Sequence, residues 1–171
     1  MLRTDPQAAF EAALGEHRRI VFKVASIYAR TPEDLRDLAQ EIILQLWRAF
    51  ASFDARRGKL STWMYRIALN VAISHARRPS WAAADRIDPI EDDHPALIGE
   101  PAAGAPDERL RELYAVIEQL PPLDRALILL YLEERSHAEI GEVLGLSETN
   151  VATKLGRLKH AMRAQIAARG G

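Results

Sequence analysis

The residues of this sequence best suited to bind a charged ligand lie near its C-terminal end. Residues 150–169 contain five basic side chains and no acidic one. The basic residues are Lys154, Arg157, Lys159, Arg163 and Arg169. A run of this kind is expected where a helix lies against phosphate groups, so the first chemistry to consider is nucleic-acid binding.

A helix-turn-helix pattern surrounds this basic run. Ser136 and Glu139 form a capping box, Gly145 suits the left-handed residue of a tight turn, and Ser147 is a typical cap for the next helix. Residues 136–163 are therefore predicted to dock on duplex DNA, with the first turn of the second helix in the major groove. The exposed contact candidates are Glu148, Thr149, Asn150, Thr153, Lys154 and Arg157. A helical hairpin with a solvated basic face would show the same local pattern.

Residues that could support catalysis are scarce. The chain has no cysteine, which excludes disulfides and thiolate zinc sites and fits a reducing cytoplasm. Its strongest metal-ligand candidates, Asp92, Asp93 and His94, have no second ligand cluster, and the other histidines lack metal-ligand spacing. We therefore expect no catalytic residue, no metal and no cofactor, and a metal-dependent enzyme is the weakest alternative.

The elements that must position the DNA contacts are helices. Apolar residues make up 48% of the chain and recur at helical spacing, and no stretch alternates like a strand, so the predicted fold class is all-α. Residues 79–107 hold five prolines and no sustained helical period. The sequence thus predicts two small helical domains, residues 1–79 and 109–171, joined by a flexible linker of residues 80–108. The three segments carry net charges of +5, -7 and +1, which makes the linker acidic.

Three helices are expected in the first domain. One runs from Phe10 to Tyr28, a second follows the cap Thr31 with Pro32 in its first turn, and Ser61 or Thr62 caps the third. The apolar face of the second helix is wider than a small core requires, which predicts that part of it meets a partner.

Two details of these helices are also predicted. Trp47 is assigned to the core, and the third helix is expected to carry Trp63, Ile67 and Val71 inward with Asn70 exposed. In the second domain, helices over residues 110–120 and 123–131 precede the helix-turn-helix.

The N-terminal residues are polar and carry Asp5 and Glu11, unlike a signal peptide, and the sequence nowhere contains eighteen consecutive apolar residues. We expect no membrane insertion and a cytoplasmic protein.

Two segments of the first domain and one of the second resemble a known family. Residues 34–42 (DLRDLAQEI) and 61–70 (STWMYRIALN) resemble the sigma-2 domain of bacterial extracytoplasmic-function sigma factors of the sigma-70 family, and residues 120–163, which begin LPPLDR, resemble their sigma-4 domain. The order of the two domains and the variable linker also match this family.

The resemblance implies a sigma factor that directs promoter-specific transcription initiation. Its implied partners are core RNA polymerase, through the clamp helices and flap of the large subunits, promoter DNA and an anti-sigma factor. The resemblance places polymerase binding on Asp37, Leu38, Gln40 and Glu41. It places minus-10 recognition and melting on Phe53, Arg56, Arg57, Lys59, Asn70 and Ser74. The helix-turn-helix contacts given above would read the minus-35 element.

Physical reasoning supports the minus-10 assignment, because opening DNA requires capture of an unstacked base, and a basic loop can hold the adjoining phosphates. The sequence also departs from the family. Gly141 stands where relatives usually carry alanine, and Gly156 weakens the recognition helix by about 1 kcal/mol relative to alanine. The alternative from another class is an autonomous helix-turn-helix regulator, which would normally carry a dimerisation or ligand domain.

Overall fold

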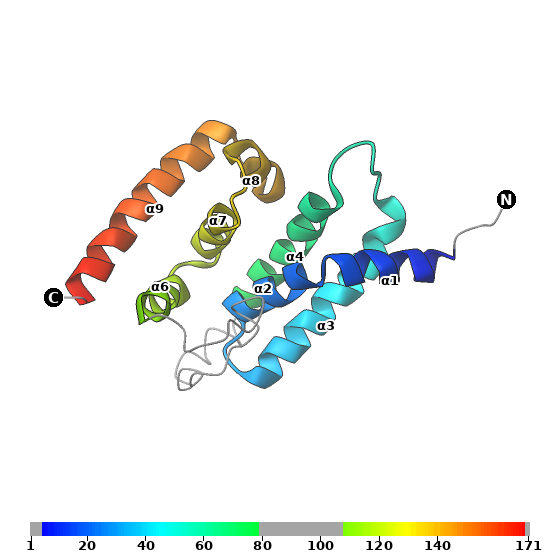
Figure 1. Cartoon of the computed structure of the whole chain (residues 1–171), viewed down its shortest axis with the longest axis horizontal. Coiled ribbons are helices and arrows are strands. Elements are labelled where there is room, and N and C mark those ends of the chain that lie inside the picture. The colour runs from blue at the N-terminus through cyan, green and yellow to red at the C-terminus, as the bar shows by residue number, and fades with distance from the viewer. Residues whose placement is uncertain (1–4, 79–107, 170–171) are drawn as a thin grey trace. The chain divides into compact units, whose positions relative to one another are not determined.

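The computed structural model describes residues 5–78 and 108–169, and the contacts within the chain divide it into two compact units after Glu100. Each unit is helical and, over the described residues, contains no strand, which confirms the all-α prediction (Figure 1). The predicted linker lies outside these residues except for Glu108, and so do Asp92, Asp93 and His94.

The first unit consists of α1 (Pro6–Glu16), α2 (Arg18–Tyr28), α3 (Pro32–Ala49), the short 3₁₀ helix η1 (Phe50–Ser52) and α4 (Leu60–Ala76). Helices α2, α3 and α4 pack against one another around the core. Tyr28, Leu38, Ile42, Leu46 and Leu69 are all 0% exposed. Full burial of each such leucine or isoleucine contributes about 1.5–3 kcal/mol, so this three-helix core holds α3 and α4 in register.

The N-terminal region forms two helices where one was predicted. The chain breaks at His17, which has φ −116° and ψ 25° and ends α1 with a bond from its amide to the carbonyl of Ala13. Gly15 weakens the last turn of α1. The two helices also pack on different parts of the unit, because Phe10 of α1 contacts Trp47 and Phe50 at the C-terminal end of α3, whereas α2 packs on both α3 and α4. The prediction of a single helix was wrong because the apolar residues at helical spacing belong to two helices that pack on different parts of the unit.

The start of α3 agrees with prediction. The Thr31 hydroxyl accepts a hydrogen bond from the Asp34 amide at 3.0 Å, Pro32 opens the helix, and Glu33 and Asp34 lie in its first turn. The cap bond stabilises the start of α3. The two acidic side chains add to this, because they interact favourably with the positive end of the helix dipole.

The start of α4 differs from prediction. Lys59 occupies the cap position with extended backbone, and in this part of the described chain no side-chain cap bond is made. Neither Ser61 nor Thr62 is the cap, because the turn before Lys59 brings the chain into the helix two residues earlier. Thr62 is instead buried, at 8% exposure.

The buried face of α4 also differs from prediction. Trp63, Ile67 and Val71 are only half-buried, and the core is filled by a neighbouring set of side chains. That set is Met64, Tyr65, Ala68, Leu69 and Ala72. The helix is apolar on most of its circumference, so periodicity alone did not identify the packed stripe.

The second unit consists of α6 (Glu108–Glu118), α7 (Pro122–Leu132), α8 (His137–Leu144) and α9 (Glu148–Arg169). These helices agree with the four predicted for this region. The long α9 contacts the other three helices and is anchored by the fully buried Val151 and by Leu155, at 1% exposure. The other three helices therefore hold α9 in place, and its opposite face is directed to solvent.

Candidate nucleic-acid and polymerase interfaces

The starts of α8 and α9 have the serine caps that the sequence predicts. The hydroxyl of Ser136 accepts from the Glu139 amide at 3.1 Å, and the hydroxyl of Ser147 accepts from the Asn150 amide at 3.1 Å. Gly145 adopts φ 71°, the left-handed conformation that favours glycine. The Glu139 carboxylate also lies 3.4 Å from Nη1 of Arg135, a pair that helps to fix the start of α8.

Gly141 has a structural reason to be glycine. A Cβ atom at this position would collide with the backbone carbonyl oxygen of Leu146. The Leu146 amide donates to the Gly141 carbonyl at 2.9 Å, so the turn closes directly over this residue. The tight turn over this residue thus explains why glycine stands here, where relatives usually carry alanine.

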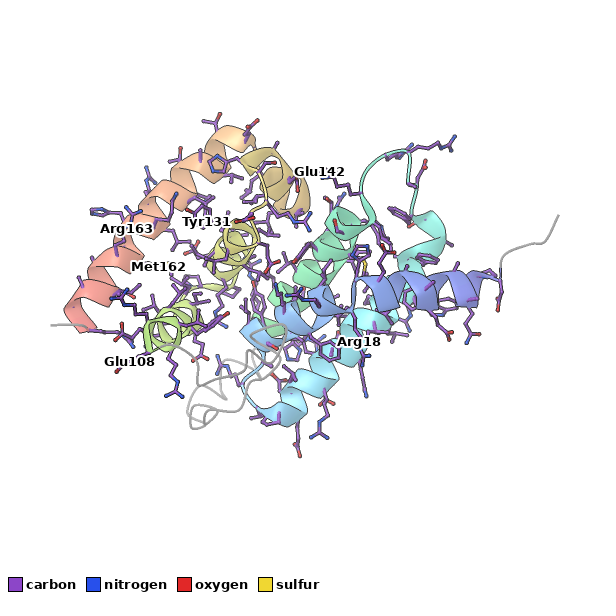
Figure 2. The ribbon with its side chains drawn as sticks, viewed as in Figure 1. Arg18, Glu108, Tyr131, Glu142, Met162 and Arg163 are labelled. Carbon is purple, nitrogen blue, oxygen red and sulfur yellow. The ribbon has the colours of Figure 1, made fainter. Side chains whose placement is uncertain are left out.

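The outer face of α9 carries the predicted minus-35 residues. Val151, Leu155, Leu158 and Met162 form the buried face. Of the six predicted contacts, Lys154 is half-buried and the others are exposed, namely Glu148, Thr149, Asn150, Thr153 and Arg157. Figure 2 shows the same division further along α9, where Met162 points to α6 and α7 and Arg163 points outward. The exposed face is thus polar and basic.

One member of the basic run is engaged within the unit. Nζ of Lys159 lies 4.5 Å from the ring centroid of Tyr131, a cation–π contact between α9 and α7. Tyr131 itself is 39% exposed. Lys159 therefore lies at the edge of the basic face.

The α6–α7 packing contains the clearest titration shift. Burial raises the pKa of the Tyr114 hydroxyl above its ordinary value, and the nearby carboxylate of Glu133 raises it further. Tyr114 stays protonated well above neutral pH and acts as a packed neutral side chain.

The predicted basic loop between η1 and α4 is organised by Asp54. One carboxylate oxygen accepts from the backbone amide and Nε of Arg56 at 3.0 and 3.2 Å, and the other lies 3.9 Å from Nε of Arg57. The two arginine side chains remain 91% and 89% exposed. Asp54 therefore holds the guanidinium groups at the surface, where they can meet phosphates. Lys59 lies exposed at the end of the same loop.

A chain of aromatic side chains links this loop to α1. Phe53 packs on Trp63 at 5.2 Å, Trp63 on Phe50 at 6.3 Å, and Phe50 on Phe10 at 5.3 Å. Phe10 then meets Trp47 at 5.2 Å. Phe53 is thus half-buried, and Trp47 is not a core residue, since 42% of it is exposed. Trp47, Phe50 and Phe53 are three positions apart in the sequence, but Phe10 and Trp63 lie further away, and no local pattern predicts that they join the same cluster.

Helix α3 borders two hollows, one on the side of α1 and one on the side of α4. The first, of about 570 Å³, lies between α1 and α3 and is mostly apolar. Its lining residues are Gln7, Phe10, Glu11, Leu14, Gln40, Ile43, Leu44 and Trp47. Leu44 is 44% exposed there. The predicted surplus of apolar residues on α3 is thus found on the side that faces α1.

The second hollow, of about 360 Å³, lies between α3 and α4. Glu41 lines it together with Asn70 and Ser74, so a predicted polymerase contact and two predicted minus-10 residues are brought together. Asp37 and Gln40 are exposed elsewhere on α3. Leu38 is 0% exposed and part of the core, and we correct its assignment as a polymerase contact.

A polar cluster that sequence reasoning missed joins α3 to the end of α4. Nε2 of His75 lies 3.1 Å from Oδ1 of Asp34, and Nδ1 of His75 lies 3.9 Å from Glu41. Nη2 of Arg78 lies 3.1 Å from the other Glu41 oxygen. The partners are about forty positions apart in sequence, beyond any local pattern.

Among residues 5–78 and 108–169 we find no group of three metal-ligating side chains. The helices described in these ranges include none that is long and apolar enough to cross a membrane.

Comparison with known families matches both units. Residues 14–82 match the model of sigma-70 region 2, and residues 110–162 match the model of sigma-70 region 4. Together they cover more than two thirds of the chain. Helices α2, α3 and α4 fall within the first match, and the helix-turn-helix falls within the second.

Relatives that match along nearly the whole of this chain agree with the two family matches. The chain is 27% identical to the extracytoplasmic-function sigma factor SigE of Mycolicibacterium smegmatis, over 96% of the chain and 65% of that protein. It is 28% identical to SigW of Bacillus subtilis, over 96% of the chain and 92% of SigW.

Solved structures show the same fold. CnrH in complex with the cytosolic domain of CnrY is similar with a TM-score of 0.64 and 22% identity, covering 95% of this chain and 90% of that one. RpoE in complex with the anti-sigma factor NepR from Bartonella quintana is similar with a TM-score of 0.68 and 17% identity, covering 94% of this chain and 96% of that one.

The two helical units match region 2 and region 4 of the sigma-70 family, and the second unit carries a helix-turn-helix, so the chain is of the sigma class of transcription factors. The chain belongs to the sigma-70 family, within its extracytoplasmic-function group.

Proposed function

We propose that this sigma factor binds core RNA polymerase and directs initiation at promoters through a separate DNA-reading surface on each unit. The observation that carries the proposal is the division of α9 into a buried apolar face and an exposed polar and basic face behind a tightly capped turn. That arrangement suits a recognition helix in the major groove.

The second unit reads the minus-35 element in this proposal. Glu148 and Asn150 lie in the first turn of α9, where a carboxylate can accept from cytosine and an amide can pair with adenine. Thr149, Thr153 and Lys154 extend the same surface. Arg157 lies one to two turns further along and binds a phosphate.

The first unit recognises and helps to melt the minus-10 element. Arg56, Arg57 and Lys59 hold phosphates of the opened strand, since all three are exposed on one loop. Asn70 and Ser74 supply polar groups beside the second hollow. Phe53 offers one ring edge to a base while its packing on Trp63 fixes the loop.

Polymerase docks on α3 in the same proposal. The apolar hollow between α1 and α3, with Leu44 and Trp47 at its exposed side, suits the clamp helices of the largest subunit. Gln40, which lines the hollow, and Asp37, which is exposed on the same helix, provide polar contacts. The second unit meets the flap of the other large subunit.

Three further features complete the proposal. The chain works in the cytoplasm, where core polymerase is found, and catalyses no reaction itself. It is held inactive by an anti-sigma factor. This last point is supported by the two solved relatives, which were determined with the cytosolic domain of CnrY and with the anti-sigma factor NepR.

An electrophoretic mobility shift assay tests the proposal against an autonomous helix-turn-helix regulator. A pool of duplex DNA with randomised upstream and downstream segments is incubated with the chain alone, with core polymerase alone and with both, and bound DNA is sequenced. We expect enriched sequences only when both proteins are present. Enrichment of the same sequences by the chain alone would overturn the proposal in favour of the regulator.

A further inference from the structure

Arg78 continues the helix face on which two of the proposed minus-10 contacts lie. Asn70 and Ser74 are four positions apart on α4, and Arg78 follows Ser74 by another four. The chain keeps to a helical path over this distance, because Arg77 after α4 still has helical backbone angles, φ -89° and ψ -2°. Residues at these intervals share one face of a helix, so a strand bound along Asn70 and Ser74 passes close to Arg78. A guanidinium group at that place suits a phosphate of the bound strand.

In the structure, the Arg78 side chain instead reaches across to α3. Its Nη2 donates to Oε1 of Glu41 at 3.1 Å. Glu41 lines the same hollow as Asn70 and Ser74, so this ion pair lies at the edge of the proposed DNA surface. A paired guanidinium offers no net charge to a phosphate, and the Glu41 carboxylate repels one. Arg78 must therefore leave Glu41 before it can neutralise a phosphate.

The pair is weak enough to separate. Its side chains, of Arg78 and Glu41, are 53% and 32% exposed. An ion pair at such exposure shifts an equilibrium by only about two- to fivefold, because water solvates both charges when they part.

The neighbouring contacts of His75 are more shielded. Its Nε2 lies 3.1 Å from Oδ1 of Asp34, with both side chains largely buried, and its Nδ1 lies 3.9 Å from the second Glu41 oxygen. These contacts join the same two helices. They keep the end of α4 on α3 when the Arg78 side chain moves away.

Glu41 also borders the surface of α3 that is proposed for polymerase. Asp37 precedes it by four residues and Leu44 follows it by three, so the three share one side of the helix. Asp37 and Leu44 are exposed, and a protein that covers them also reaches Glu41. Two carboxylates one turn apart suit a basic group of the partner. Such a group competes with Arg78 for Glu41.

We propose that the Glu41–Arg78 pair is an autoinhibitory contact, which withholds Arg78 from promoter phosphates until core polymerase binds Glu41. The inference rests on the proposed function and adds Arg78 to its DNA surface. Because the coupling between two ligands is reciprocal, promoter DNA strengthens the binding of core polymerase by the same factor.

Binding of a labelled single-stranded oligothymidylate to the chain without polymerase tests the withheld state. With Glu41→Gln, which removes the charge at the same shape, we expect the affinity to rise about two- to fivefold. The slope of log affinity on log salt should steepen by up to about 0.7, the value for one added phosphate contact on a single strand. Glu41→Gln combined with Arg78→Ala should return the slope to the wild-type value. Asp37→Asn is the matched control, because it removes an equal charge one turn earlier on α3 and should leave the slope unchanged.

Binding of core polymerase and of promoter DNA selected by the holoenzyme tests the release. Glu41→Gln should lower the affinity of the chain for core polymerase about two- to fivefold, because the partner loses a carboxylate. In the holoenzyme, Arg78→Ala should flatten the salt slope of promoter binding by about 0.7 to 1. Glu41→Gln should leave that slope unchanged, because polymerase already occupies Glu41. Thermal unfolding checks that each variant is folded.

The outcomes are distinct. An equal slope change in Asp37→Asn and Glu41→Gln, or an unchanged slope in Glu41→Gln, would show that Arg78 is not withheld and would overturn the inference. So would a holoenzyme in which Arg78→Ala keeps the full slope, or a Glu41→Gln variant with full affinity for core polymerase. A wild-type chain that fails to bind core polymerase at all would instead overturn the proposed function.

Discussion

The carbonyl oxygen of Leu146 lies directly against the position that a Cβ atom of Gly141 would occupy. This contact joins α8 to the turn that places α9. Gly141→Ala should therefore lower the free energy of unfolding by about 1–3 kcal/mol, the usual cost of forcing an extra methyl group into a packed site. Urea denaturation followed by circular dichroism measures the change.

Gly156→Ala is the matched control for this substitution. A Cβ atom at Gly156 meets no neighbouring atom within 4 Å, and the residue lies inside α9. The substitution should raise the free energy of unfolding by about 0.5–1 kcal/mol, because alanine loses less backbone entropy in a helix. Equal effects at the two glycines would contradict the close contact at Gly141.

Glu134 should be replaceable by glycine with a gain in stability. It adopts φ 60° after α7, while the Arg135 amide donates to the Leu130 carbonyl at 3.1 Å, the pattern of a left-handed helix end. Glu134→Gly removes a conformational cost and should raise the free energy of unfolding by about 0.5–1 kcal/mol. Glu142→Gly, inside α8, should lower it by a similar amount. Destabilisation by both variants would refute the left-handed assignment.

Arg157→Ala tests the phosphate contact of α9. Binding of holoenzyme to promoter DNA, measured against salt concentration, should show a slope of log affinity on log salt that is smaller by about 1. Arg111→Ala removes an exposed charge from α6 and should leave the slope unchanged. An unaltered slope in Arg157→Ala would remove this residue from the proposed DNA surface.

Asn70→Ala tests promoter opening. Asn70 is exposed beside the second hollow, away from the apolar hollow proposed for polymerase, so the variant should bind core polymerase normally. Permanganate modification of unpaired thymines in the promoter should fall about tenfold, the loss expected for one base contact. Normal modification would show that Asn70 has no part in melting.

The sequence predicted those features that local patterns determine. The caps at Thr31, Ser136 and Ser147 were predicted correctly, because a cap needs only a side chain and an amide two or three residues away. The left-handed Gly145 was predicted for the same reason.

Features that depend on distant packing were not predicted. Trp47 is partly exposed although Phe10 of α1 packs against it, and the break at His17 separates α1, which contacts the C-terminal end of α3, from α2, which packs on both α3 and α4. Leu38 lies in the segment that the family resemblance assigns to polymerase docking, but its side chain is buried in the core. The contact of Arg78 with Glu41 joins residues 37 positions apart, and no periodicity records it.

The central claim is that this chain gives core polymerase its promoter specificity, and run-off transcription tests it most directly. Core polymerase is incubated with a library of linear promoter fragments, with and without the full chain, and the 5′ ends of the transcripts are sequenced. We expect start sites that appear only with the chain and share two upstream elements, one for each unit. The same start sites with core polymerase alone, or no transcript with the chain present, would contradict it.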